Sequence, residues 1–317
     1  MGKQDIVTKE YISRNDIFSE LVNYYIFSGK RIIRPEDLRE TDATEGIIVT
    51  DADGKEYTIE KYRDIFKKSV LKLTKEAGFL FIGIEDQTMI HYAMPVRSML
   101  YDSISYAGQI KDIARLHRKQ KDKLSGEEFL SGMTAKDKLI PIITIVVYFG
   151  QKEWSAPKSL HEMFGELSPK LLEYIENYHI HLIDPHQMKE QDFEKLGESL
   201  QYVMRFIAAS GDKTAMVELL KKYPEQYGHM EKDAAELLKA CTNINIEIAK
   251  EKEEVNMCKA WDDMAEDSRK QGLSQGIENV IMNCYRLGMS EKEIAKITDS
   301  SVEYVKVTIV RKQKIVK

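Results

Sequence analysis

The sequence predicts an α/β or α+β domain over residues 1–190, followed by a helical C-terminal region. Up to about residue 190, strand-like apolar stretches alternate with stretches of helical periodicity, as in sheets flanked by helices. Beyond that point Gly and Pro are few and apolar residues follow helical spacing. The end of the chain carries two short helix patterns. We therefore divide the chain into residues 1–190, 191–275 and 276–317.

The first clear element is a helix in the segment RNDIFSELVNYYIFSGK. Its apolar residues recur at the i, i+3, i+4 and i+7 spacing of an amphipathic helix, and Gly29 ends it. The next segment, IIRPEDLRETDATE, is interpreted as a loop or a short helical turn. In EGIIVTDADGKEYTIEKY, a DADG turn separates apolar stretches, and Tyr57 and Ile59 alternate as on a strand.

Three further strands and one long helix follow. The best-defined strand is AGFLFIGIEDQ, and the helix begins near Pro95, because proline is favoured in a first turn. The run KLIPIITIVVYFG, rich in Ile and Val, is typical of a fully buried central strand. A short strand, IHLIDP, comes last, and these elements complete the predicted domain.

The C-terminal segment GMSEKEIAKITDSSVEYVKVTI contains two capping boxes, in which Ser290 precedes Glu293 and Ser300 precedes Glu303 by three residues. Two short helices joined by a tight turn fit a helix-turn-helix, which often binds DNA. A protein-interaction or dimerisation element is the alternative. The residues expected to point inward are Ile294, Ile297, Val302, Val305 and Ile309.

Composition limits the function classes. The formal net charge of −5 disfavours a protein that coats nucleic acid over its whole surface, although the segment KDIARLHRKQKDK is locally basic. The chain has no pattern of a signal peptide, and its longest apolar run is shorter than the roughly 20 residues of a spanning helix. We therefore expect a cytoplasmic protein without a membrane partner. Three widely spaced cysteines indicate neither a disulfide framework nor a thiolate zinc site.

The segment LFIGIEDQ places polar side chains at the end of an apolar strand. Because alternate residues of a strand share a face, Glu85 and Gln87 point the same way. Asp64 starts the preceding strand-like stretch, so it would come close to Glu85 if the two strands were antiparallel neighbours. Two such carboxylates could hold Mg²⁺ or Mn²⁺ and serve a metal-dependent phosphodiesterase.

These segments resemble a known family. NDIFSELVNYYIFSGKRIIRPEDLRETDATE, YRDIFKK, FIGIEDQTMIHYAMPVRSMLYDSISYAGQI, KLIPIITIVVYFG and GMSEKEIAKIT, in that order, resemble the recombination-promoting nuclease / putative transposase family of the PD-(D/E)-X-K superfamily. The resemblance implies a restriction-endonuclease-like core with a mixed sheet flanked by helices. It also implies a divalent-metal-dependent DNA endonuclease linked to recombination or mobile elements.

The resemblance also implies roles for individual residues. Asp64 and Glu85 would be the metal carboxylates for Mg²⁺ or Mn²⁺, Glu20 on the first helix an additional acidic ligand, and Gln87 would occupy the superfamily's Lys position. Glutamine cannot supply the cation with which that Lys stabilises charge on the phosphate. The replacement charge and the contacts to DNA are expected from Lys67, Lys68, Arg97, Tyr101 and Lys306.

Several alternatives remain open at the level of sequence. Asp64 and Glu85 could form ordinary ion pairs with Arg63 or Arg97, and Arg97 with Tyr101 could be a structural pair on the sheet. The chain could then be a degenerate nuclease fold that only binds DNA or protein, alone or as a homo-oligomer.

The histidine-rich segment HIHLIDPHQ allows two readings. It allows a zinc site, because His179 and His181 would share a face of a strand and Asp184 and His186 follow closely. It fits better with a pair of histidines at a strand edge beside an Asp turn.

Overall fold

The computed structural model describes residues 3–40, 44–50, 56–62, 65–71, 78–242, 244, 246, 248 and 253–315. The chain divides into two compact units, one formed by residues 1–243 and 247–255 and the other by residues 244–246 and 256–317. The boundaries expected at residues 190 and 275 do not coincide with this division, because helices of the 191–242 region pack against the N-terminal helix of the first unit.

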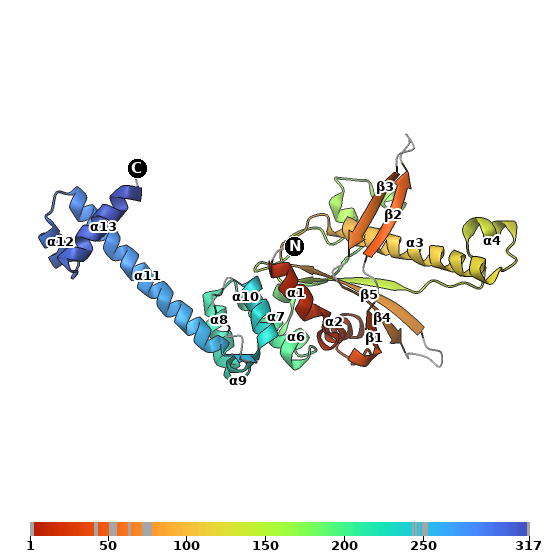
Figure 1. Cartoon of the computed structure of the whole chain (residues 1–317), viewed down its shortest axis with the longest axis horizontal. Helices are drawn as coiled ribbons and strands as arrows, with labels where there is room; N and C mark the ends of the chain where they lie inside the picture. The colour runs from red at the N-terminus through yellow and green to blue at the C-terminus, as the bar shows by residue number, and fades with distance from the viewer. Residues whose placement is uncertain are drawn as a thin grey trace. The chain divides into compact units, whose positions relative to one another are not determined.

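A five-stranded mixed sheet is the centre of the first unit (Figure 1). Its strand order is β1-β4-β5-β6-β7; β1, β4 and β5 are antiparallel neighbours, whereas β5, β6 and β7 run parallel. This confirms the predicted α/β class with a mixed sheet flanked by helices. The strands are β1 (Leu38–Glu40), β4 (Ile65–Leu71), β5 (Gly78–Gln87), β6 (Ile142–Tyr148) and β7 (His181–Ile183).

The strands predicted from apolar runs are present, and β1 was missed. Leu38–Glu40 was interpreted as part of a loop or helical turn, which holds only for the short 3₁₀ turn Pro35–Asp37 before it. Only Leu38 of this strand is buried, so three residues at the sheet edge give no readable alternation. Strand β6 is buried along almost its whole length, as its Ile and Val content predicts.

Helices cover both faces of the sheet. On one face lie α1 (Lys3–Ser13) and α2 (Asn15–Phe27), which buries Ile17, Phe18, Leu21 and Val22 and ends before Gly29 at a φ of 85°, as predicted. On the other face lies α3 (Met94–Gln120), which connects the parallel strands β5 and β6. A crossover of this length is what parallel neighbours require.

The remaining elements of this unit are short. The hairpin of β2 (Thr44–Thr50) and β3 (Glu56–Tyr62) lies beside α3 (Figure 1), and the predicted DADG turn between its strands lies outside the described residues. The other elements are α4 (Gly126–Ser131), the 3₁₀ turns His161–Met163 and Pro185–Gln187, α5 (Pro169–Leu172), α6 (Glu190–Phe193), α7 (Glu198–Ala209), α8 (Lys213–Lys222), α9 (Pro224–Gly228), β8 (Met230–Glu231), α10 (Lys232–Cys241) and β9 (Glu254–Val255).

The second unit consists of α11 (Met257–Arg286), α12 (Glu291–Ile297) and α13 (Val302–Ile315). The C-terminal part of α11 packs with α12 and α13 around a small apolar core. That core contains the predicted Ile294, Val305 and Ile309, with Val302 partly buried. Ile297 was expected inside but is 56% exposed, because it is in the last turn of α12 and points away from this core.

The capping box at Ser290 is formed in both directions with Glu293. The box predicted at Ser300 is wrong: the hydroxyl of Ser301 accepts the N–H of Tyr304, at 3.1 Å, and Ser300 instead donates to the Thr298 carbonyl. Consecutive serines made the cap ambiguous by one residue. Among the described helices of both units, none is long and apolar enough to cross a membrane.

Candidate functional site

The end of β5 carries carboxylates on opposite faces of the sheet. Glu85 and Gln87 face α3, whereas Asp86 between them faces α1 and accepts a hydrogen bond from the hydroxyl of Thr8. Glu85 is fully buried and Gln87 nearly so. The pair predicted from LFIGIEDQ is therefore on one face, beneath the N-terminal part of α3.

Glu85 forms an ion pair with α3. The guanidinium of Arg97 lies 3.0 Å from Oε2 of Glu85, and its Nε donates to the hydroxyl of Tyr101 at 2.9 Å. Arg97 also lies over the Tyr101 ring. The i, i+4 spacing of Arg97 and Tyr101 on α3 produces this contact. Both structural alternatives considered from the sequence, an ion pair of Glu85 with Arg97 and an Arg97–Tyr101 pair, are thus present in the molecule.

Arg97 lies between the buried Glu85 carboxylate and the solvent. Its side chain is 28% exposed, whereas that of Glu85 is 0% exposed. A carboxylate buried without a counter-ion costs several kcal/mol, so the ion pair explains how the strand tolerates Glu85. The same geometry holds a cation beside the carboxylate and within reach of a molecule at the surface.

A polar layer continues along the inner side of α3. The Asp102 carboxylate accepts from Thr144 on β6 at 2.6 Å and from the Tyr178 hydroxyl at 2.7 Å. Ser98 and Ser105 on α3 are also buried. Sequence reasoning missed Asp102. The signal was available, because polar residues recur with helical spacing on a face that should otherwise be apolar.

Gln87 and His91 lie where β5 leads into α3. The Gln87 carbonyl accepts from Phe149 N, at 2.7 Å, and its side-chain amide donates to the carbonyl of Asp86 at 2.9 Å. Burial lowers the pKa of His91, and the charge of Arg97 lowers it further. A neutral imidazole is therefore favoured at His91, near the Glu85–Arg97 pair. The sequence patterns did not single out this histidine.

Asp64 lies outside the described residues. The next residue in the sequence, Ile65, pairs with Ile84, which precedes Glu85. Lys67 pairs with Ile82 and so lies on the face opposite to Glu85. Its ammonium donates to the Ser13 carbonyl and to Asn15, and burial lowers its pKa.

The expectation that Lys67 supplies charge or contacts DNA is therefore wrong: its side chain is 1% exposed and is used to hold the turn between α1 and α2. Lys68 faces the same way as Glu85, because adjacent strand residues alternate. It pairs with Phe81 and its ammonium lies 5.7 Å from the centre of that ring.

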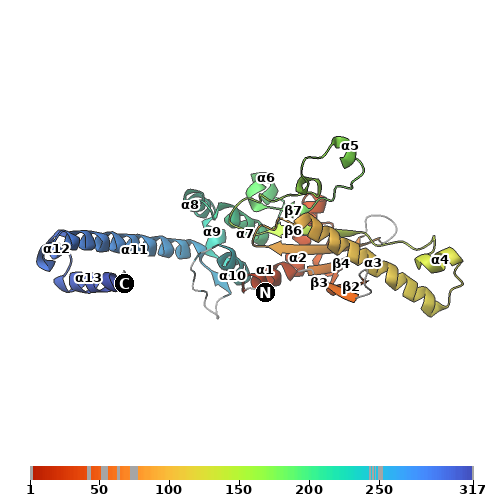
Figure 2. The same cartoon turned by 90° about the horizontal axis from the view of Figure 1, so that it is seen from above.

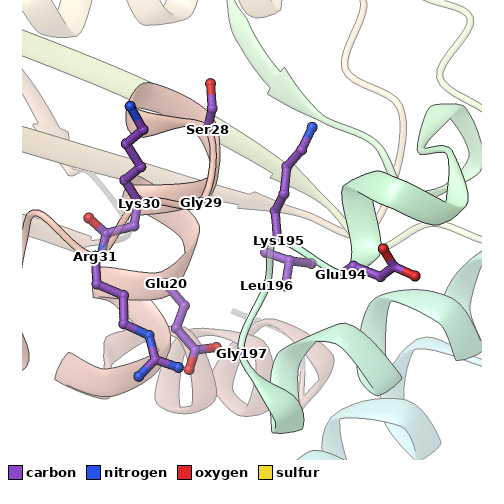
Figure 3. A pocket seen from close by; sticks show the side chains of 10 residues that line it. Glu20, Ser28, Gly29, Lys30, Arg31, Glu194, Lys195, Leu196 and Gly197 are labelled. Carbon is purple, nitrogen blue, oxygen red and sulfur yellow. The ribbon is translucent and has the colours of Figure 1, made fainter.

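Glu20 is not brought together with Glu85. It lies on α2, which covers the opposite face of the sheet, and its carboxylate contacts the backbone of Gly197 at the N-terminus of α7. Figure 3 shows this contact within a cavity that Lys30, Arg31 and Lys195 also line. Burial raises the pKa of Glu20, while the hydrogen bond from Gly197 lowers it. Glu20 thus joins two helices, and its predicted role as a metal ligand is not supported.

The remaining predicted residues lie elsewhere. Lys306 is exposed on α13 of the second unit, with its ammonium 3.7 Å from Glu291. In the histidine-rich segment, His181 packs edge-on against Tyr25 and His186 pairs with Asp184 at 2.9 Å. Within the described ranges, no group of three or more His, Cys, Asp or Glu side chains is arranged to hold a metal ion.

The fold and this face define a mixed α/β protein with a buried carboxylate–guanidinium pair beneath the helix that joins its parallel strands. A family model described as "Putative transposase, YhgA-like" matches residues 60–236, more than half of the chain. The chain therefore belongs to the YhgA-like putative transposase family, which confirms the transposase family that the sequence resembles. No curated protein and no solved structure matches it.

Proposed function

We propose that this protein is a divalent-metal-dependent DNA endonuclease of the PD-(D/E)-X-K type. The observation that carries the proposal is the placement of Glu85 and Gln87 on one face of β5, with the Arg97 cation at the carboxylate. Membership of a family named for transposases supports DNA as the substrate. Hydrolysis of a phosphodiester needs groups that neutralise charge at the phosphate, and this face supplies them.

The donor set at this face suits a hard cation. Glu85 and Gln87 offer oxygen atoms from β5. In the sequence, Asp64 directly precedes β4, the strand that pairs with β5. Mg²⁺ and Mn²⁺ prefer such oxygen ligands, so Glu85 and Asp64 would hold the ion. When bound, the ion would acidify a water molecule and neutralise charge on the phosphate. A carboxylate can contact Arg97 and a cation together, because it has two oxygens.

Arg97 supplies the charge that Gln87 lacks. A guanidinium presents donors in a planar fork suited to phosphate oxygens, and it stays charged at any relevant pH. Tyr101 fixes its orientation through the 2.9 Å hydrogen bond. Arg97 would then bind and orient the scissile phosphate, while the Gln87 amide orients the water. In this proposal the cation comes from α3 instead of from the strand.

A second candidate is a DNA-binding module without cleavage. The full burial of Glu85 and its ion pair with Arg97 favour this reading, because a structural pair needs no substrate. The two functions differ in one measurable property. The nuclease cuts DNA with a metal ion, and the module binds DNA without cutting it.

The deciding experiment is cleavage of supercoiled plasmid and of single-stranded DNA in Mg²⁺ or Mn²⁺, with EDTA as the metal-free control. We expect nicking by the intact chain and a loss of at least about 100-fold in Glu85→Gln and Asp64→Ala. Arg97→Ala should lose a similar factor, and Arg97→Lys less. DNA binding without any metal-dependent cleavage would instead establish the module.

Asp86→Asn is the matched control. It removes a neighbouring carboxylate of β5 from the opposite face, where Asp86 contacts Thr8. Cleavage should persist in this variant, provided that circular dichroism shows an intact fold. If Asp86→Asn lost as much activity as Glu85→Gln, the assignment of the active face would be wrong.

A further inference from the structure

The C-terminal half of α3 and helix α4 form a projection from the sheet, defined here as residues 111–138 (Figures 1 and 2). Its first part, residues 111–123, carries six Lys or Arg residues against two Asp, whereas the whole chain has a net charge of −5. All six of these cations are exposed: Lys111, Arg115, Arg118, Lys119, Lys121 and Lys123.

The tip of this projection exposes two large apolar side chains. Phe129 is 76% and Leu130 89% exposed, and both lie on α4. Burying such side chains against an apolar surface would stabilise the fold, so leaving both in water forgoes that stabilisation. Neighbouring exposed aromatic and aliphatic residues beside a basic helix indicate a contact surface.

The projection is held in a fixed shape by its own contacts. A capping box between Ser125 and Glu128 starts α4. Gly132, at a φ of 74°, ends it so close to α3 that a Cβ there would lie 2.8 Å from the Cβ of Ala114. Next to Ala114 in the chain is Arg115, so the end of α4 lies directly against the basic stretch.

A histidine ties the loop after α4 to the same helix. His117 on α3 contacts Asp122 at 2.7 Å and Asp137 at 2.8 Å, and Asp137 also accepts from the N–H and hydroxyl of Thr134. Phe129 and Leu130 are therefore presented on an ordered support. A loose loop would instead fold such side chains against the nearest apolar surface.

We infer that the projection of residues 111–138 binds duplex DNA, with its Lys and Arg side chains on the phosphates and Phe129 and Leu130 inserted against the bases of a groove. Basic side chains provide the affinity for a phosphate backbone, and apolar wedges that widen or kink a groove are common in proteins that bind DNA by shape. The inference rests on DNA being the substrate, and it adds a binding surface separate from Glu85.

Charge decides between DNA and other occupants. An acidic protein would satisfy the cations, but it would not explain why four of them run along α3 and two follow directly after it, a spacing that can follow a backbone of regular charge. An anionic membrane would satisfy both features. The family association with transposases favours DNA, and the membrane becomes an outcome of the test.

The test measures binding of the full chain to a fluorescent duplex by anisotropy in EDTA, over a series of salt concentrations. The variant is Arg118→Ala/Lys119→Ala/Lys121→Ala. We expect at least about a tenfold higher Kd and a slope of log K against log salt that is smaller by about 2–3, since each lost phosphate contact removes about 0.9. Three exposed lysines elsewhere in the unit provide the matched control: Lys170→Ala/Lys213→Ala/Lys221→Ala.

The apolar tip is tested separately with Phe129→Ser/Leu130→Ser, a change of exposed residues that leaves the core intact. We expect a higher Kd with an unchanged salt slope, because no charge is removed. Equal effects of the test substitutions at 118, 119 and 121 and of the control substitutions at 170, 213 and 221, or no effect of either set, would overturn the inference. So would binding of phosphatidylserine vesicles that depends on Phe129 and Leu130 while DNA binding does not.

The result does not depend on cleavage. Binding is measured without metal, so it is scored whether or not the chain cleaves DNA. If cleavage fails but the projection controls binding, the nuclease proposal falls and the DNA surface stands. If cleavage depends on Glu85 but DNA binding does not change when the projection is mutated, the nuclease proposal stands and the DNA surface falls.

Discussion

Glu20 and Gly197 show how one residue's identity follows from its neighbour. The carboxylate of Glu20 occupies the space where a Cβ at position 197 would lie, 1.9 Å from Oε1, and accepts the backbone N–H there. It thereby supplies the cap that α7 lacks from its own N-cap residue, Gly197. A carboxylate also suits the positive end of the helix dipole. Glu20 of α2 thus has a structural role.

Replacing Gly197 with Ala should destabilise the fold by about 1 kcal/mol. The flexible Glu20 side chain can swing away from the new methyl group, but α7 then loses its acceptor. Urea unfolding measures the change. Gly165→Ala is the control, because a Cβ there meets nothing within 4 Å. In a Glu20→Ala background, Gly197→Ala should have no further effect; a persistent loss would assign the cost to the backbone instead.

The residues around Glu85 show which contacts can be predicted from the spacing of residues within one strand or one helix. Alternation along a strand places Glu85 with Gln87, and helical spacing places Arg97 with Tyr101, so these pairs could be predicted. The same alternation means that Lys67 and Lys68 cannot both face Glu85. Which of them does depends on the pairing of β4 with β5, and that register is not readable from either strand alone.

At the scale of helices, the start of α13 depends on one serine. Because Ser301 accepts the N–H of Tyr304, Ser301→Ala should destabilise the second unit by about 1 kcal/mol. Ser300→Ala is the adjacent control and should cost less, since its hydroxyl only donates to Thr298. Thermal unfolding followed by circular dichroism compares the two. A larger loss in Ser300→Ala would restore the capping box predicted from the sequence.

The loop after α4 should respond to pH through His117. Hydrogen bonds to Asp122 and Asp137 raise its pKa above 6.5. The charged imidazole's contribution is therefore complete below pH 6.5 and disappears as pH rises through the raised value. Amide exchange in residues 120–138, corrected for intrinsic rates, should accelerate over that range.

Asp137→Asn checks this assignment. It removes a carboxylate whose pKa is lowered to about 2, so it stays charged wherever His117 titrates. The pH dependence of exchange should become weaker and shift toward a lower pH. An unchanged profile in this variant would mean that another group controls the loop.

For the molecule as a whole, two separate cores predict two unfolding events. Ile294 is fully buried in the core of the second unit, so Ile294→Ala should cost about 2–5 kcal/mol there. Calorimetry should show one transition moving to lower temperature while the other stays in place. A single transition that shifts as one would show that the units unfold together.

The fold class could be predicted because its signals are local. The apolar runs that became β5 and β6 and the periodic segment that became α2 are each complete within one stretch of chain. That α7 and α10 belong to the same compact unit as the sheet could not be predicted. Their place depends on packing between residues far apart in the sequence, such as that of α10 against α1. The same reason explains why the contact of Glu20 with Gly197 was missed.

The alternation at the end of β5 also limits how this chain can change length. Removing or adding one residue between Ile82 and Glu85 would exchange the two faces, sending Glu85 toward α1 and Asp86 toward Arg97. Homologues that share the Glu85–Arg97 pair should therefore keep β5 free of insertions and deletions. Length variation should collect in connections such as the one between α5 and β7, where an added residue leaves the position of Glu85 unchanged.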